Sequence, residues 1–135
     1  MTEFTADEII VGYWNIKGLA SALRMSCHFA GVPYKVHSYA LDETFNRDEW
    51  LTQAKLELKE KNAYINLPYV IDGDIVITQS NACMSYLGRK LNQWGNDEIS
   101  IIKCEQLLCE LMDLRNSVVR FSYPEIGRAS CRERV

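Results

Sequence analysis

The chain has 135 residues, of which 47% are hydrophobic and 24% charged, and its formal net charge is −3. This composition predicts one folded domain and part of a second, and the scattering of its 15 basic residues argues against a nucleic-acid-binding surface. The apolar runs are too short to span a bilayer and residues 1–4 do not resemble a secretory signal, so we expect a cytoplasmic protein without a membrane partner.

The N-terminal third alternates strand and helix patterns. Residues 9–14 are rich in β-branched and aromatic side chains, which is typical of a buried strand. Residues 19–31 place apolar side chains at helical spacing and end in a glycine suited to a helix C-cap. Residues 34–39 alternate and predict a half-buried strand. The three segments predict a βαβ unit with a right-handed crossover.

A hairpin and two helices follow. Residues 50–61 have helical composition and a charged tail that we interpret as a solvent-exposed face. The Asp72-Gly73 turn joins two short strands, and Ser80 is the predicted N-cap of a helix that ends near Asn92. A long helical pattern of apolar residues then begins at Glu98.

The fold class is therefore predicted to be α/β. We expect a thioredoxin-like N-terminal domain over residues 1–92, of order βαβ-ββα with a mixed sheet. A linker over residues 93–97 leads to the start of an all-α domain over residues 98–124.

The cysteines favour a reduced protein without a metal site. The five are Cys27, Cys83, Cys104, Cys109 and Cys131. They form no C-x-x-C pair and no cluster with histidine, which weakens the metal and disulfide interpretations. Three lie at apolar helix positions, where free cysteine behaves as a small buried hydrophobe. Thioredoxin carries C-x-x-C after its first strand, but residues 13–16 here read Tyr-Trp-Asn-Ile, so dithiol chemistry is not expected.

Four short motifs resemble those of a glutathione transferase of the mu class. They are GYWNIKGLA at 12–20, NLPYVIDG at 66–73, ITQSNA at 77–82 and YLGRK at 86–90. Their order and spacing agree over about residues 9–123, and the sigma class, which shares part of the pattern, is the alternative. The resemblance implies a thioredoxin-like glutathione-binding domain followed by a helical domain, with glutathione as co-substrate and no cofactor.

The resemblance gives Tyr13 the catalytic role. Only the thiolate of glutathione is reactive, and a thiol of pKa ~8.5 is about 3% ionised at pH 7. A phenol that donates a hydrogen bond to the sulfur could lower this pKa by ~2 units, which requires about 2.7 kcal/mol. From the residues alone, without the resemblance, a core aromatic on a strand is the preferred interpretation of Tyr13.

The implied glutathione site surrounds this tyrosine. Gln79 and Ser80 would bind the γ-glutamyl carboxylate at a helix N-terminus, although Ser80 could also merely cap its helix. Pro68 is expected after a cis peptide bond that turns the Leu67 backbone toward the cysteinyl unit, with an ordinary strand-start proline as the alternative. The other residues that the resemblance places along the peptide are Trp14, Leu19 and Asn66.

The glycine end of glutathione is implied to contact Arg47 and Trp50. A guanidinium and an indole N–H both suit a carboxylate. The family usually has a lysine four residues after this tryptophan, where this chain has Ala54, so Lys55 is the proposed substitute. The segment before Asn66 is also a few residues longer than is usual in the family.

Three further residues match family positions at subunit or substrate contacts. Asp113 matches an aspartate that reaches across a dimer to the γ-glutamyl ammonium, and an exposed helix aspartate is the alternative. Tyr123 matches a second tyrosine that assists the electrophile. Tyr64 matches an aromatic residue that docks into the partner subunit, which implies a homodimer.

Residues 125–135 lack apolar periodicity and resemble the translation of a short-read sequencing adapter. We interpret them as a non-native tail that replaces the true C-terminus, with a genuine basic tail as the alternative.

Three functions are consistent with these residues. The first is an enzyme of detoxification that conjugates reduced glutathione to electrophilic small molecules. The second is a non-catalytic binding or structural protein on the same scaffold, as in lens crystallins. The third is an inactive fragment of a longer gene product. The intact Tyr13 and Gln79-Ser80 favour the enzyme, although the sequence does not name its electrophile.

Overall fold

The structure is a computed structural model that describes residues 8–40 and 47–122. The chain divides into two compact units, one ending at Trp94 and the other beginning at Gly95. This division falls within the predicted linker.

The first unit is a four-stranded mixed sheet with helices on its faces. The strands are β1 (Ile9–Trp14), β2 (Tyr34–Tyr39), β3 (Tyr69–Asp72) and β4 (Ile75–Thr78). The helices are α1 (Ala20–Ala30), the π-helical segment η1 (Glu49–Ala54), α2 (Lys55–Lys59) and α3 (Ser80–Lys90). The strand order is β2-β1-β3-β4, with β1 parallel to β2 and antiparallel to β3. This arrangement confirms the predicted βαβ-ββα order and the mixed sheet.

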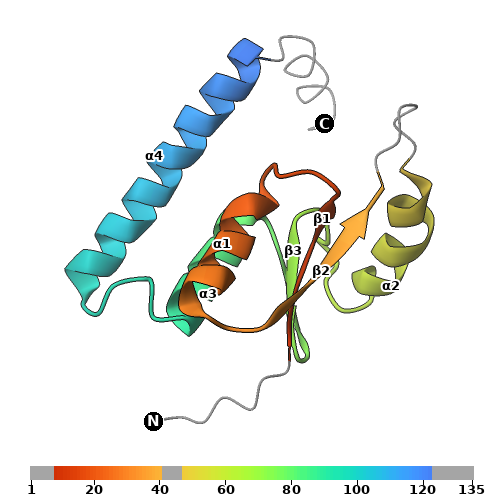
Figure 1. The fold of residues 1–135 in the computed structure, drawn as a ribbon, viewed down its shortest axis with the longest axis horizontal. Coiled ribbons are helices and arrows are strands. Elements are labelled where there is room, and N and C mark those ends of the chain that lie inside the picture. The colour runs from red at the N-terminus through yellow and green to blue at the C-terminus, as the bar shows by residue number, and fades with distance from the viewer. Residues whose placement is uncertain (1–7, 41–46, 123–135) are drawn as a thin grey trace. The chain divides into compact units, whose positions relative to one another are not determined.

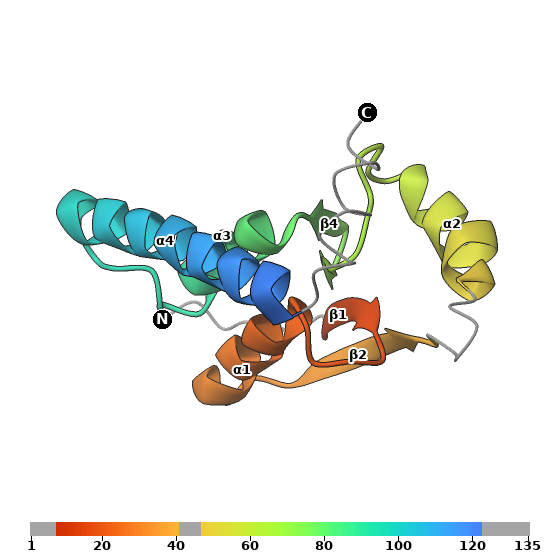
Figure 2. The same cartoon turned by 90° about the horizontal axis from the view of Figure 1, so that it is seen from above.

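The sheet separates two hydrophobic layers because successive strand residues face opposite sides. Val11 of β1 packs with Leu23 of α1 and Leu87 of α3 in one fully buried cluster. Its neighbour Ile10 packs on the other side against a cluster that contains Trp50 of η1. Figures 1 and 2 show α1 and α3 together on one face of the sheet and α2 on the other.

β2 is less buried than its alternating pattern predicts. Tyr39 is buried and Tyr34 half-buried, but the four residues between them are exposed. β2 is an edge strand, and only its two end residues, Tyr34 and Tyr39, pack with the hydrophobic clusters. The prediction of a half-buried strand was therefore wrong for most of its length.

Gly12 allows the Tyr69 ring to lie directly on β1. A Cβ added at Gly12 would lie 2.1 Å from Cζ of Tyr69. Tyr69 is 1% exposed, its ring stacks on Trp50 at a centroid distance of 5.9 Å, and its hydroxyl lies 2.6 Å from that of Tyr39. Burial raises the pKa of both Tyr39 and Tyr69, so both hydroxyls stay protonated at neutral pH. The ring cannot move aside without breaking these contacts.

We therefore expect Gly12→Ala to lower the free energy of unfolding by about 1–3 kcal/mol, since it overpacks a filled core. Denaturant unfolding of the complete protein measures this loss. Gly31→Asn is the matched control, because Gly31 has a left-handed φ of 68° and open space around its Cα, and asparagine tolerates that conformation. Equal stability of Gly12→Ala and the control would contradict the overpacking argument.

Two cysteines form part of the core. Cys27 and Cys83 are fully buried, which raises their pKa values to about 11 and about 12. This confirms the interpretation of these two thiols as buried hydrophobes. Cys104 is half-buried and Cys109 exposed, whereas Cys131 lies outside the described residues.

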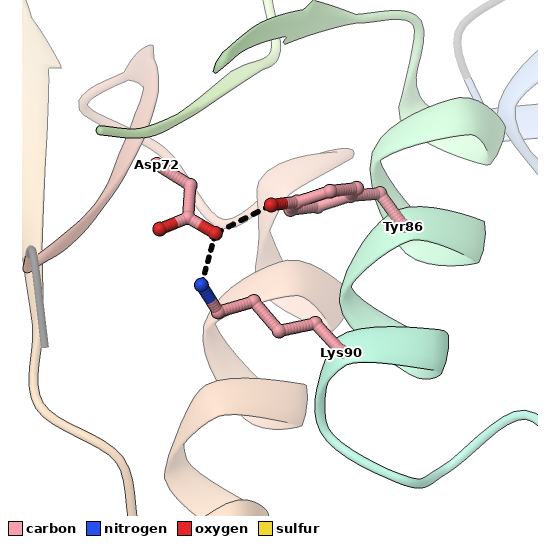
Figure 3. A network of polar contacts seen from close by, with 3 residues as sticks. All are labelled: Asp72, Tyr86 and Lys90. Atoms are coloured by element: carbon pink, nitrogen blue, oxygen red, sulfur yellow. Dashed lines mark hydrogen bonds and ion pairs between the residues drawn. The ribbon is translucent and has the colours of Figure 1, made fainter. Parts of the chain in front are cut away.

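A buried carboxylate ties α3 to the β3–β4 hairpin. Asp72 is 7% exposed, and its Oδ2 accepts a hydrogen bond of 2.5 Å from the Tyr86 hydroxyl. The same oxygen forms an ion pair with Lys90 Nζ. Figure 3 shows both side chains extending from consecutive turns of α3 toward Asp72. Burial and the hydrogen bond to Asp72 raise the pKa of Tyr86 to about 12. The network fixes the C-terminal half of α3 over the hairpin.

The second unit contains α4 (Glu98–Ser122), which confirms the predicted long helix. Asp97 and Ser100 form reciprocal hydrogen bonds at its start, from Ser100 N to Asp97 Oδ1 (2.9 Å) and from Asp97 N to Ser100 Oγ (3.1 Å). The hydrogen bonds from Ser100 lower the pKa of the Asp97 carboxyl. None of the helices in the described ranges has the length and apolar character needed to cross a membrane.

Candidate functional site

The strand register brings three predicted segments together at one edge of the sheet. This edge is formed by strand ends and is not the edge along which β2 lies. Gly12 of β1 pairs with Tyr69 of β3, and Tyr69 pairs with Thr78 of β4. The end of β1, the start of β3 and the end of β4 therefore adjoin. The residues just after Gly12, just before Tyr69 and just after Thr78 are the predicted site residues Tyr13, Trp14, Asn66, Leu67, Pro68, Gln79 and Ser80.

Tyr13 is held at this edge by the loop that follows β1. Its side chain is 7% exposed, and its ring lies against the Cα of Gly18. A Cβ at Gly18, whose φ is +38°, would lie 2.5 Å from Cε1 and 2.9 Å from Oη of Tyr13. No residue in the described ranges accepts a hydrogen bond from the Tyr13 hydroxyl. A phenol with an unused donor at this edge is what the predicted catalytic role requires.

The loop before β3 presents an open peptide edge. The Thr78 hydroxyl accepts a hydrogen bond from Asn66 N (3.0 Å) and lies 2.7 Å from Asn66 O, so the loop is anchored to β4. The Leu67–Pro68 peptide bond is cis, as predicted. Within the part of the chain that the structure describes, the Leu67 backbone makes no hydrogen bond. Such a backbone can pair with an extended peptide in the manner of an added strand.

The start of α3 differs in detail from the prediction. Gln79, with φ 73° and ψ 119°, occupies the N-cap, and Ser80 is the first helical residue. The prediction that Ser80 is the N-cap was therefore wrong, because the non-helical backbone of Gln79 takes that position. Among the described residues no side chain caps this helix, so its first N–H groups remain available to an anion. A positive φ at a residue other than glycine is rare and concentrates at binding sites.

Arg47 also reaches this edge of the sheet. Its guanidinium carbon lies 6.0 Å from the centroid of the Trp14 ring, within the range of a cation–π contact. Leu19, which immediately precedes α1, is half-buried and packs against the cluster that contains Tyr13. A cation thus lies beside Trp14, and an apolar side chain packs with the cluster that contains Tyr13.

Three of the remaining four predicted site residues are not placed with this group. The fourth, Trp50, is 2% exposed and packs against Tyr39 and Tyr69 in the second core cluster, against which the site residues Trp14 and Leu67 also pack. Lys55 is half-buried at the start of α2. Asp113 is exposed on α4 in the second unit, and Tyr123 lies outside the described residues. Their roles in binding stay predictions.

The sequence reasoning missed two residues that shape the site. Thr78 reads as an ordinary strand end, and only the fold shows that its hydroxyl anchors Asn66. Arg24 reads as a solvated helix charge, yet its Nη2 donates to Ile16 O and Lys17 O in the loop beside Tyr13. No short-range pattern identifies either contact, since the partners lie 7 to 12 positions away.

Comparison with known proteins identifies the family. Residues 10–89 match the sequence profile described as "Glutathione S-transferase, N-terminal domain", which is more than half of the chain. The chain belongs to the glutathione S-transferase family. The resemblance inferred from the four motifs is thereby confirmed, as is the thioredoxin-like fold of the glutathione S-transferase N-terminal domain.

Similar curated proteins assign this glutathione S-transferase chain to the mu class. It is 38% identical over 121 residues to "Glutathione S-transferase Mu 5" of Rattus norvegicus, covering 87% of this chain and 52% of the relative. It is 36% identical over 120 residues to "Glutathione S-transferase Mu 3" of Homo sapiens, covering 87% and 52%. The chain thus spans about half the length of the curated relatives that it matches.

Solved glutathione S-transferases share the fold. A Pi-class enzyme from Onchocerca volvulus superimposes with a TM-score of 0.70 at 23% identity, over 89% of this chain and 52% of the other. A Nu-class enzyme from Haemonchus contortus gives 0.66 at 21% identity, over 84% and 50%.

Proposed function

We propose that the complete protein conjugates reduced glutathione to electrophilic small molecules, a reaction of detoxification. The observation that carries this proposal is the convergence of Tyr13, the Leu67 backbone and the uncapped start of α3 at one edge of the sheet. A phenolic donor, a peptide edge and an anion site are the groups that recognise a γ-glutamyl peptide with a thiol. Membership of the glutathione S-transferase family supports the same reaction.

In the proposed complex, glutathione extends along this edge. Its γ-glutamyl carboxylate binds Gln79, Ser80 and the N–H groups of α3, while its cysteinyl backbone pairs with Leu67. The guanidinium of Arg47 attracts the glycine carboxylate. The residues proposed to complete the site are Trp14, Leu19, Trp50, Lys55, Asn66 and Pro68.

The proposed chemistry is thiolate stabilisation without a covalent enzyme intermediate. The thiol proton leaves to solvent, and the Tyr13 hydroxyl donates a hydrogen bond to the resulting sulfur anion. A sulfur lone pair then forms the C–S bond to the electrophile, and the leaving group departs with its bonding electron pair. Holding both reactants together supplies the remaining rate enhancement, and no cofactor takes part.

Further parts of the proposal concern assembly. The Tyr64 side chain is 85% exposed, which suits an aromatic that docks into a second subunit of a homodimer. In that dimer Asp113 would face the γ-glutamyl ammonium of the partner's glutathione, and Tyr123 would assist the electrophile. The reduced Cys27 and Cys83 in the core favour a cytoplasmic location.

Glutathione binding is expected to stabilise the complete protein against heat. At about ten times the dissociation constant, a ligand that binds only the folded state adds about 1.4 kcal/mol, which raises Tm by about 3–6 °C. A thermal denaturation series with increasing reduced glutathione measures this shift.

Cysteinylglycine is the matched control, since it keeps the thiol and lacks the γ-glutamyl group that α3 is proposed to bind. It should raise Tm by much less at the same concentration. A melting curve indifferent to glutathione, or equal shifts from both thiols, would contradict the proposed site.

A further inference from the structure

Arg24 connects α1 to the loop that follows β1. The Arg24 side chain is half-buried, and its Nη2 donates hydrogen bonds of 3.0 Å to both Ile16 O and Lys17 O. These carbonyls belong to consecutive residues in the middle of the loop. One guanidinium nitrogen therefore holds two adjacent peptide units.

The same loop packs against the ring of Tyr13. Gly18 follows Lys17 directly, and its Cα touches the Tyr13 ring near the hydroxyl, as the 2.9 Å separation between a Cβ built there and Oη indicates. The side chains of Ile16 and Lys17 are exposed, so packing contributes little to fixing the loop. Its start is tied to β2 by the Asn15 N to Tyr39 O hydrogen bond of 2.9 Å.

We propose that Arg24 is a positioning residue of the conjugation reaction. Its hydrogen bonds to the carbonyls of Ile16 and Lys17 keep the loop in contact with the Tyr13 ring. This contact fixes the position of the phenolic hydroxyl relative to the glutathione sulfur. Hydrogen bonds weaken steeply with angle and distance, and a misplacement of about 1 Å can cost up to 10²-fold in rate. This inference rests on the proposed function, because it concerns the same phenol.

Arg24→Met in the complete protein tests the inference. We expect the apparent pKa in the pH profile of kcat/KM to rise by about 0.7 units, from about 6.5, and kcat/KM near pH 6.5 to fall about threefold. The deficit should shrink at alkaline pH, where the bound thiol ionises without help. A loss of folded protein would instead lower activity by the same factor at every pH.

Two comparisons show whether Arg24 acts through Tyr13. Lys59→Met removes one positive charge from the exposed surface of α2 and should leave the pH profile unchanged. In a Tyr13→Phe background, Arg24→Met should add no further shift, since the group that it positions is absent. An equal shift in both backgrounds would overturn the inference, as would an unshifted profile of Arg24→Met itself.

Arg24→Lys is the second variant, for the case in which Arg24→Met does not fold. Lysine keeps the charge but is shorter than arginine, so it should reach only one carbonyl and shift the profile in the same direction by less. An unshifted profile overturns the inference. If the parent protein conjugates no glutathione, the proposed function fails; if the parent is active and only the Arg24 variants are unshifted, the inference alone fails.

Discussion

Tyr13→Phe is expected to raise the apparent pKa of bound glutathione by about 2 units in the complete protein. The variant keeps the ring that packs on Gly18 and removes only the hydroxyl that faces the sulfur in the proposed complex. A shift from about 6.5 to about 8.5 lowers the thiolate fraction at pH 7 about 25-fold. Ultraviolet difference spectroscopy of the enzyme–glutathione complex over a pH series measures this fraction directly.

Turnover should fall in the same direction but by a smaller factor. A thiolate of higher pKa is intrinsically more nucleophilic, and this partly offsets the rate that is lost through the lower thiolate fraction. We therefore expect kcat/KM at pH 7 to fall by about 3-fold to 25-fold, and the deficit to shrink above pH 9 as both proteins hold glutathione as the thiolate.

Tyr34→Phe is the matched control for the loss of a hydroxyl. Tyr34 pairs with Ile9, at the opposite end of β1 from Tyr13, so its hydroxyl lies far from the proposed sulfur position. Its pH profile should equal that of the parent protein. If Tyr13→Phe also left the profile unchanged, the catalytic role of Tyr13 would be excluded.

Lys90→Met is expected to have the largest effect on stability. The variant removes the cation beside the Asp72 side chain, which is only 7% exposed, and leaves that carboxylate with only the Tyr86 hydroxyl as a side-chain partner in residues 8–40 and 47–122. An uncompensated buried charge costs about 3 kcal/mol or more. The measurement is denaturant unfolding of the complete protein.

Asp72→Asn combined with Lys90→Met should recover much of this loss, because a neutral amide no longer needs a counter-charge and can still accept from Tyr86. Lys35→Met is the surface control, since the Lys35–Glu8 pair has side chains 62% and 39% exposed, and it should cost less than about 1 kcal/mol. A double variant as unstable as Lys90→Met would show that the buried charge is not the cause.

The fold was largely predictable because its elements carry strong local signals. The runs at 9–14 and 34–39 match β1 and β2 residue for residue, and the Asp72-Gly73 turn joins β3 to β4 as expected. The errors arose where the surroundings override the local pattern. The alternation of β2 does not bury its centre, because the strand lies at the edge of the sheet. Ser80 suits an N-cap, but the backbone conformation of Gln79 decides where α3 begins.

The sequence alone shows which chemical groups the site can use. The motifs around Tyr13, Pro68 and Ser80 were sufficient to indicate a glutathione transferase. Only the antiparallel register of β1, β3 and β4 decided that these groups share one edge. The contacts of Arg24 with Ile16 and Lys17 likewise exist only in the folded chain, as does the ion pair between Lys90 and Asp72. The physical reason is that residue types and short-range spacing are local, whereas hydrogen bonds between distant segments depend on the backbone path that brings them within 3 Å.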